Sequence, residues 1–343
     1  MKIVVTGGAG FIGSKFVSNA LSQGHEVITI DKLTYAGNLE NLGTHINHVN
    51  HTFYKEDICH KNEIEQIILK HEPEIIIHMA AESHVDRSID CADDFIQTNI
   101  VGTQKLLEAT LLYYNNMANK NKFRFLHLST DEVYGTLGLN GKFDETMPYR
   151  PNSPYAASKA ASDHLVRSYN KTYSLPTLIV NSSNNYGPNQ YPEKLIPLTI
   201  LNALEQKSLP VYGEGKQVRD WLYVDDHIDA LFAIISSGKI GESYCVGADS
   251  EIDNLSLVKL ICEILNQISP RKQSYENLIT FVKDRPGHDF RYATNADKLK
   301  NHTGWRARTP FREGLQQTIE WYFQRFEELR HNKDARSRIG LIS

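Results

Sequence analysis

Side chains that could carry out chemistry are concentrated in two short segments, Ser129–Glu132 and Tyr155–Lys159. Together they contain a threonine, a tyrosine and a lysine, a set that can remove a proton and a hydride from an alcohol. The adjacent carboxyl groups of Asp131 and Glu132 add an acid and a base, which could expel water next to the new ketone. Oxidation of an alcohol needs only the threonine, the tyrosine and the lysine. The pair of carboxyl groups therefore favours an enzyme that also eliminates water.

A tyrosine followed four positions later by a lysine occurs twice, at Tyr155/Lys159 and at Tyr212/Lys216. The second pair spans Gly213–Gly215, which favours a turn, so its side chains are not expected to share a face. The first pair begins a helical pattern, and its side chains should lie one turn apart. We expect the ammonium of Lys159 to favour the phenolate of Tyr155 and to lower its pKa.

The two neighbouring carboxyl groups can work together only if they differ in protonation. This requires a raised pKa for Asp131, from burial or from an ionised Glu132 beside it. Successive residues of a strand point to opposite faces, so both groups can reach one site only if the chain bends at Thr130. Thr130 follows a predicted strand, and ligands bind at that end of the strands in an open α/β sheet. Its hydroxyl could therefore bridge to the reacting alcohol.

Glycines spaced as G-x-x-G-x-x-G, from Gly7 to Gly13, follow the first predicted strand and open the first predicted helix. Glycine lets the backbone turn tightly and approach a pyrophosphate, with amide N–H groups at a helix N-terminus. Asp31 ends the second predicted strand, where a carboxylate binds the adenosine ribose and repels a 2′-phosphate. The pattern predicts an NAD site, and Asp57, after the third predicted strand, is a candidate adenine contact.

The composition is that of a soluble globular protein of one large or two modest domains. The 343 residues are 41% hydrophobic and 23% charged, with a net charge of −4. The chain has no excess of positive charge, so the composition gives no sign of a nucleic-acid or membrane partner. The N-terminus enters a strand without a signal-like apolar segment, and the four cysteines are scattered without a CxxC pair, so we expect a cytoplasmic protein with reduced thiols and no metal site.

Strand-like apolar runs alternate with helical stretches through the first half of the chain. This order predicts an α/β fold, a Rossmann-like doubly wound parallel sheet with a smaller, interleaved C-terminal substrate domain. We expect the NAD-binding domain to cover residues 1–186, with 223–248 returning to it. Residues 187–330 should mainly form the smaller substrate domain, and 331–343 a polar tail that frays. Helices are expected near 93–114, 155–173, 255–268 and 311–329.

Nine segments carry a resemblance to the extended short-chain dehydrogenases/reductases, and within them to the dTDP-glucose 4,6-dehydratases. The resemblance extends from residue 1 to about residue 325. The matching segments are Thr6–Gly13, Asp31–Asn38, Ala80–Ser88, Ser129–Gly135, Tyr155–Lys159, Asn181–Gly187, Tyr191–Pro197, Arg219–Tyr223 and Asp284–His288.

The resemblance implies a hydro-lyase that converts dTDP-glucose to dTDP-4-keto-6-deoxyglucose with bound NAD, in deoxysugar biosynthesis. C4 is oxidised, water is eliminated across C5 and C6, and C6 is reduced. Tyr155 would take the C4 hydroxyl proton, while Lys159 holds the nicotinamide ribose. Glu132 would take the C5 proton and Asp131 would protonate the leaving C6 hydroxyl. These last two assignments rest on the family and not on the spacing.

The resemblance also implies two sets of contacts. The expected cofactor contacts are Gly7, Gly10, Phe11, Ile12, Gly13, Asp31, Lys32, Leu33, Thr34, Asp57, Ile58, Ala80, Ala81, Ser83, Thr98, Tyr155, Lys159 and Asn185. The expected substrate contacts are His84, Thr130, Asn184, Glu193, Lys194, Leu195, Pro210, Tyr212, Arg219, Asn254, Arg285 and His288. A departure from the family's pattern occurs at Tyr244–Ala248, where Cys245 and Ala248 bear on fine specificity.

Three alternatives stay open at this point. The same chemistry could act on another nucleoside-diphosphate hexose. A sugar-nucleotide 4-epimerase would share the tyrosine and lysine but would not need Asp131 and Glu132. A catalytically silent NAD-holding protein would not need the whole set of Thr130, Asp131, Glu132, Tyr155 and Lys159.

By analogy with the family, the helices at 93–114 and 155–173 predict a homodimer. His45, His48 and His51 are interpreted as a surface run, not as metal ligands.

Overall fold

The computed structural model describes residues 1–330 of the chain, so the predicted tail at 331–343 lies outside the described residues. Its centre is a seven-stranded parallel sheet in the order β10-β6-β5-β4-β1-β2-β3. The bounds of these strands are Lys2–Thr6 (β1), Glu26–Asp31 (β2), His51–Lys55 (β3), Ile75–His78 (β4), Arg124–Thr130 (β5), Thr177–Ser182 (β6) and Ser243–Val246 (β10). The order reverses between β1 and β4, which is where such sheets bind ligands.

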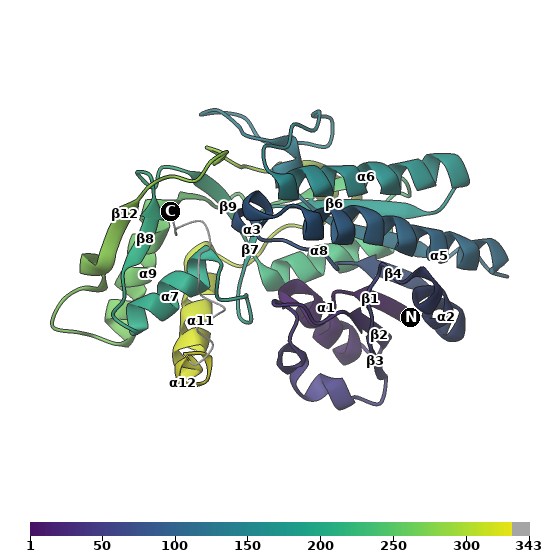
Figure 1. Ribbon diagram of the computed structural model, residues 1–343, viewed down its shortest axis with the longest axis horizontal. Coiled ribbons are helices and arrows are strands. Elements are labelled where there is room, and N and C mark those ends of the chain that lie inside the picture. Colours follow the sequence, from purple (N-terminus) through teal and green to yellow (C-terminus); the bar gives the residue numbers. More distant parts are fainter. Residues whose placement is uncertain (331–343) are drawn as a thin grey trace.

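Helices cover both faces of this sheet (Figure 1). Continuous apolar strands such as Ile75–His78 are buried throughout, as a sheet covered on both sides requires. One face carries α1 (Phe11–Ser22), α8 (Val224–Ser237) and α10 (Asp297–Thr303). The other carries α2 (Lys61–His71), α5 (Thr103–Asn116) and α6 (Pro154–Tyr173). The predicted fold class is confirmed.

The helix expected at 93–114 has an internal change of geometry. It begins as α4 (Asp93–Phe95), continues as a π-helical segment (η2, Ile96–Gly102), and becomes α5. Within that segment, Asn99 accepts a bond from the backbone N–H of Glu82 and donates to the hydroxyl of Ser158 (2.9 and 2.8 Å). A hydrophobic pattern cannot reveal the extra residue of a π turn, because apolar spacing changes little over one turn.

The second half of the chain builds a smaller lobe with its own apolar core (Figure 1). Its strands are β7 (Asn184–Tyr186), β8 (Leu209–Tyr212), β9 (Val218–Tyr223), β11 (Glu251–Asp253) and β12 (Ile279–Val282). Its helices are α7 (Leu195–Leu204), α9 (Asn254–Ile268), α11 (Phe311–Gln324) and α12 (Phe326–Leu329). The helix expected at 311–329 is therefore interrupted at Arg325. Helix α7 was not expected, because its sequence is apolar on nearly every side and has no polar face.

The remaining elements are short. They are the 3₁₀ segments η1 (Leu39–Asn47), η3 (Asp131–Tyr134) and η4 (Tyr275–Leu278), and the helix α3 (Val85–Asp90). Helix α8 and strand β10 follow the small strands in sequence but pack with the large sheet, so the chain crosses between the lobes more than once. Within residues 1–330, no helix combines the length and apolar character needed to cross a membrane.

Candidate active site

The glycine loop is built by close backbone contact. A side chain at Gly13 would place its Cβ 2.1 Å from the carbonyl oxygen of Gly7, so only glycine fits there. Asp31, at the end of β2, accepts hydrogen bonds from the N–H groups of Ala9 (2.9 Å) and Leu33 (2.8 Å). Burial raises the pKa of this carboxyl, and the two N–H bonds oppose the rise. The carboxylate therefore joins the glycine loop to the segment after β2.

A cavity of about 300 Å³ extends from this loop along the carboxyl ends of the strands. All the predicted cofactor contacts except Leu33 line it: Gly7, Gly10, Phe11, Ile12, Gly13, Asp31, Lys32, Thr34, Asp57, Ile58, Ala80, Ala81, Ser83, Thr98, Tyr155, Lys159 and Asn185. Leu33 lies outside this lining: it turns the chain (φ 57°) and donates its N–H to Asp31. Asp57 forms an ion pair with Lys32 at 2.8 Å. The cavity has the residues and position of a dinucleotide site.

The chain bends where the two carboxyl groups require it. Strand β5 ends at Thr130 and the 3₁₀ turn η3 begins at once, with the hydroxyl of Thr130 accepting a hydrogen bond from the N–H of Glu132 (3.3 Å). Both Asp131 and Glu132 consequently line the same cavity. A continued strand would have sent them to opposite faces.

The surroundings of the two carboxyl groups differ. Burial, followed by the charges of Glu132 and Asp220, raises the pKa of Asp131 well above its usual value. The pKa of Glu132 is also raised by burial, but the cations Arg285, Arg219 and Lys194 oppose this shift. Positive neighbours favour the ionised form, so the arrangement suits a protonated Asp131 beside an ionised Glu132.

Tyr155 and Lys159 lie one turn apart on α6, and both are buried. The tyrosine hydroxyl is hydrogen-bonded to the side chain of Thr130. The ammonium of Lys159 donates to the carbonyl oxygen of Leu128 at 2.8 Å. Helix geometry and the end of β5 thus bring the threonine, tyrosine and lysine together.

The pKa shift of Tyr155 is opposite to the expected one. The pKa of Tyr155 is raised, because burial and the charge of Glu132 outweigh the hydrogen bond from Thr130. The expected stabilisation by Lys159 does not govern the shift, since that ammonium is directed to Leu128 and burial lowers its own pKa to about 8.

A second cavity of about 160 Å³ lies against the smaller lobe and shares Ser83, Glu132, Asn184, Glu193 and Lys194 with the first. All the predicted substrate contacts except Thr130 line it: His84, Asn184, Glu193, Lys194, Leu195, Pro210, Tyr212, Arg219, Asn254, Arg285 and His288. Thr130 lines the first cavity. Glu132 therefore stands where the two cavities meet, while Cys245 and Ala248 line neither of them.

Two guanidinium groups, those of Arg219 and Arg285, line the second cavity. Arg285 forms an ion pair with Asp86 at 3.0 Å, and Tyr212 donates to the other carboxyl oxygen of Asp86 at 3.1 Å. Arg219 is buried against Tyr292, with its guanidinium carbon 4.2 Å from the ring centre. Guanidinium groups bind phosphate oxygens in a forked geometry, so these two side chains suit a diphosphate.

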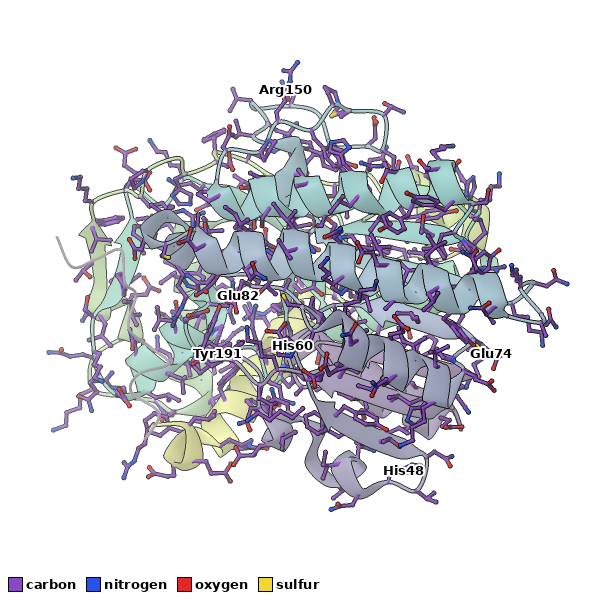
Figure 2. All side chains as sticks on the ribbon, turned by 45° about the vertical axis from the view of Figure 1, so that its right-hand side comes forward. His48, His60, Glu74, Glu82, Arg150 and Tyr191 are labelled. Atoms are coloured by element: carbon purple, nitrogen blue, oxygen red, sulfur yellow. The ribbon has the colours of Figure 1, made fainter. Side chains whose placement is uncertain are left out.

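Sequence reasoning missed a cluster that joins the two lobes beside the cavities. Arg87 lies over the ring of Tyr35 (4.0 Å) and donates to Glu193 (3.1 Å), and Tyr35 in turn packs against Tyr191. Tyr191 and Glu82, both lining residues of the first cavity, come from different parts of the chain (Figure 2). Tyr35, Glu82, Arg87 and Tyr191 all stand inside segments that carried the family resemblance, so a signal for them was present.

The predicted histidine run lies away from both cavities. His45 is 3.0 Å from the hydroxyl of Ser18 and His51 is 2.9 Å from that of Thr29. His48 lies near the outer edge of the molecule (Figure 2).

A family model, related sequences and solved structures all match this chain to 4,6-dehydratases. A family model described as GDP-mannose 4,6 dehydratase matches residues 4–318. A probable dTDP-glucose 4,6-dehydratase from Sinorhizobium fredii is 51% identical, covering 100% of this chain and 99% of that protein. A crystal structure of dTDP-glucose 4,6-dehydratase from Streptomyces venezuelae with NAD and TYD bound is 39% identical, with a TM-score of 0.87 and coverage of 98% and 99%.

The same fold also occurs in epimerases. A UDP-glucose 4-epimerase from Thermotoga maritima with UDP-glucose is 29% identical, with a TM-score of 0.85 and coverage of 94% and 99%. The fold alone therefore does not separate the two activities, whereas sequence identity favours the dehydratases. The chain belongs to the dTDP-glucose 4,6-dehydratase family of the extended short-chain dehydrogenases/reductases.

Proposed function

We propose that this protein converts dTDP-glucose to dTDP-4-keto-6-deoxyglucose and water, using bound NAD. The observation that carries the proposal is the position of two neighbouring carboxyl groups on the dinucleotide cavity: Asp131 is buried there, and Glu132 stands where this cavity meets the second cavity, which is lined by Arg219 and Arg285. An epimerase needs the neighbouring tyrosine and lysine but has no use for this pair. Membership of the dehydratase family supports the same reaction.

The cofactor site fits NAD through its own residues. Gly7 and Gly13 allow the backbone to approach a pyrophosphate, and Asp31 offers a carboxylate at the position of the adenosine ribose. Phosphate on that ribose would face the same carboxylate, so NAD is favoured over NADP. When bound, NAD would accept a hydride from C4 and later supply it to C6.

The side chains divide the proton transfers among themselves. Tyr155, assisted by Thr130, removes the proton of the C4 hydroxyl as C4 becomes a ketone. The ketone acidifies C5–H, and Glu132 removes that proton. Asp131 protonates the C6 hydroxyl, which leaves as water while a C5–C6 double bond forms. Reduction at C6 and return of the proton to C5 complete the 4-keto-6-deoxy sugar.

The second cavity supports recognition of a nucleoside diphosphate. Arg219 and Arg285 are proposed to hold the diphosphate. His84 and Asn184 would lie near the sugar, and His288 is a further proposed substrate contact. The residues that would surround the nucleoside are Glu193, Lys194, Leu195, Pro210, Tyr212 and Asn254. Thymidine is chosen because the relatives are named for it.

The test is incubation of the purified protein with dTDP-glucose, UDP-glucose and GDP-mannose. Mass spectrometry detects the loss of one water, and absorbance in alkali detects the 4-ketone. We expect water loss with dTDP-glucose at the lowest substrate concentration. Water loss confined to another nucleotide sugar would correct the substrate, and isomerisation without water loss would replace the dehydratase with an epimerase.

We also propose a homodimer formed through α5 and α6, which lie side by side on one face of the sheet (Figure 1). Tyr173 on α6 and Leu112 on α5 are 51% and 41% exposed, large apolar or aromatic side chains that a partner could cover. Light scattering on the purified protein tests the mass of the assembly.

A cytoplasmic location is proposed from the four free cysteines of the described chain, and cell fractionation tests it.

A further inference from the structure

A carboxylate with no part in the reaction lies beneath the redox set. Asp163 is fully buried on α6, four residues after Lys159, and therefore one helical turn along the same buried face. An ionised carboxylate removed from water is strongly destabilising unless hydrogen bonds and a positive charge compensate it. The surroundings of Asp163 should therefore show what balances its charge.

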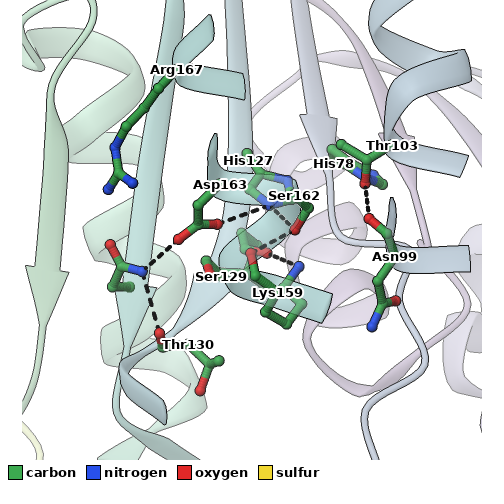
Figure 3. A network of polar contacts seen from close by, with 12 residues as sticks. His78, Asn99, Thr103, His127, Ser129, Thr130, Lys159, Ser162, Asp163 and Arg167 are labelled. Atoms are coloured by element: carbon green, nitrogen blue, oxygen red, sulfur yellow. Dashed lines mark hydrogen bonds and ion pairs between the residues drawn. The ribbon is translucent and has the colours of Figure 1, made fainter. Parts of the chain in front are cut away.

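The hydrogen bonds of Asp163 are concentrated on one oxygen. Its Oδ2 accepts from the hydroxyl of Tyr149 (2.7 Å) and from the amide of Asn181 (3.0 Å). Its Oδ1 has no hydrogen-bond donor among the described residues and lies 3.3 Å from Nε2 of His127 (Figure 3). Burial raises the pKa of this carboxyl, but the hydrogen bonds and positive charges around it outweigh that effect and lower the pKa, which favours the ionised form.

Two nearby histidines do not supply the balancing charge, and the nearby arginine does not bond to Asp163 directly. His127 is fully buried, and burial together with the charge of Lys159 lowers its pKa to about 4, so it is neutral at ordinary pH. His78, on the next strand, is likewise held neutral by burial. Arg167 donates its hydrogen bonds to the hydroxyls of Tyr149 (2.6 Å) and Ser243 (3.0 Å), not to Asp163.

Arg167 and Lys159 are the cations whose charges interact with that of Asp163, and of the two Lys159 belongs to the redox set. Burial lowers the pKa of Lys159 to about 8, and the charge of Asp163 opposes that shift. The ammonium itself donates to the carbonyl oxygen of Leu128 on β5. The charges of Lys159 and Asp163 thus act through a buried, low-dielectric region without direct contact.

A second connection joins Asp163 to the reacting end of β5. The amide nitrogen of Asn181 donates to Asp163 and also to the carbonyl oxygen of Thr130, at 3.2 Å. Thr130 is the residue at which the chain bends into Asp131 and Glu132. The helix that carries Tyr155 and Lys159 is thereby tied to the turn that carries the two carboxyl groups.

We propose that Asp163 is a positioning residue: the buried counter-ion of Lys159 and, through Asn181, the anchor of Thr130. It does not touch the reacting atoms. The inference rests on the function proposed for Lys159 in the oxidation step, but its stability test does not require activity.

The first experiment is Asp163→Asn, which removes the charge and keeps the shape. The amide oxygen can replace Oδ2, and the amide nitrogen then faces His127, whose neutral ring can accept a bond. The rate of cofactor reduction with dTDP-glucose is measured against pH. The decline expected above pH 8, where Lys159 loses its proton, should move to lower pH by about one unit or more, a tenfold change in the proton equilibrium.

Two control variants separate charge from structure. Asp163→Glu keeps the charge and should return the decline toward its original pH. Asp226→Asn removes another buried carboxylate, which accepts from the N–H groups of Arg308 and Thr309. It should lower Tm and leave the pH of the decline unchanged. An unshifted decline in folded Asp163→Asn would overturn the proposal.

The second experiment needs no substrate and remains decisive if Asp163→Asn folds poorly. Thermal unfolding is compared for Asp163→Asn, Lys159→Met and the double variant. If the two charges balance each other, the double variant should be more stable than Asp163→Asn, because no unpaired ammonium remains buried. If the loss of stability in the double variant equals the sum of the losses in the two single variants, the counter-ion role is contradicted. The purified protein could show no dehydratase activity while the stabilities of the three variants are non-additive. That result would refute the proposed reaction but support the pairing of the two charges.

Discussion

The hydroxyl of Thr294 donates a hydrogen bond to Oδ2 of Asp131 at 3.2 Å, across 163 positions of the sequence. The other oxygen of this carboxyl group, Oδ1, accepts a longer hydrogen bond from the hydroxyl of Thr130 (3.4 Å). The two threonine hydroxyls hold the two oxygens of the Asp131 side chain, and the shorter bond comes from Thr294. Backbone bonds from Phe143 to Ala293 and from Asn295 to Phe143, both 2.8 Å, hold Thr294 in place.

Replacing Thr294 with Val should slow water elimination by roughly tenfold, the effect of losing one hydrogen bond of about 1.4 kcal/mol. Oxidation at C4 should change little, because Tyr155 does not depend on this contact. Single-turnover measurements of cofactor absorbance and of water loss separate the two steps. Thr294→Ser keeps the hydroxyl and should retain elimination. Equal elimination rates in Thr294→Val and the parent protein would exclude the orienting role.

Glu132→Gln should retain cofactor reduction and lose elimination by roughly 100-fold or more, since a positioned general base contributes about that much. The amide keeps the size of the side chain but cannot take the C5 proton. Accumulated reduced cofactor together with unexchanged C5–H is the expected signature. A parallel loss of oxidation and elimination would contradict the assignment of the base.

Tyr155→Phe should stop cofactor reduction, because the C4 hydroxyl proton then has no acceptor. Thr130 alone is expected to leave less than about one-hundredth of the rate. The buried ring is retained, so Tm should change by no more than a few degrees. Cofactor absorbance after mixing with dTDP-glucose is the measurement, and full reduction in the variant would require another base.

Asp220 offers a test of stability against pH. It is fully buried beside Asp131, and burial raises its pKa from 3.8 to about 6. Between these two values the folded chain binds a proton that the unfolded chain releases, so this group stabilises the fold at low pH and that stabilisation is lost as pH rises through 6. Relative to Asp220→Asn, the parent protein should gain about 1.4 kcal/mol of unfolding free energy between about pH 7 and pH 5. Denaturant titrations at both values measure it.

The hydrogen bonds that Asp220 accepts from the N–H groups of Ala248 and Ser250 are altered equally at both pH values in that comparison. They therefore cancel from the pH dependence. A pH-independent difference between the parent and the variant would show that Asp220 ionises normally.

Gly13→Ala should abolish cofactor binding, because the new methyl group would meet the carbonyl oxygen of Gly7 at 2.1 Å and the loop backbone would have to move. Gly138→Ala is the matched control, since a methyl group there has no neighbour within 4 Å. Calorimetric titration with NAD compares the two. Parental affinity in Gly13→Ala would mean that the loop does not hold the pyrophosphate.

The sequence alone determined the features that depend on neighbours along the chain. The glycine spacing, Asp31 at the end of β2, and the single turn between Tyr155 and Lys159 are local, so strand and helix periodicities were sufficient to predict them. The alternation of strands and helices likewise predicted the parallel sheet. The substrate contacts came from family resemblance, and no periodicity would have brought Arg219 and Arg285 to one cavity.

Tertiary structure decided what depends on burial and on contacts between distant segments. It placed Thr294 beside Asp131, Asn181 between Asp163 and Thr130, and Glu132 where two cavities meet. It also reversed the expected pKa shift of Tyr155, because the desolvation of a phenol depends on everything packed around it and not on its nearest lysine in sequence. Charge states at this site are properties of the folded interior.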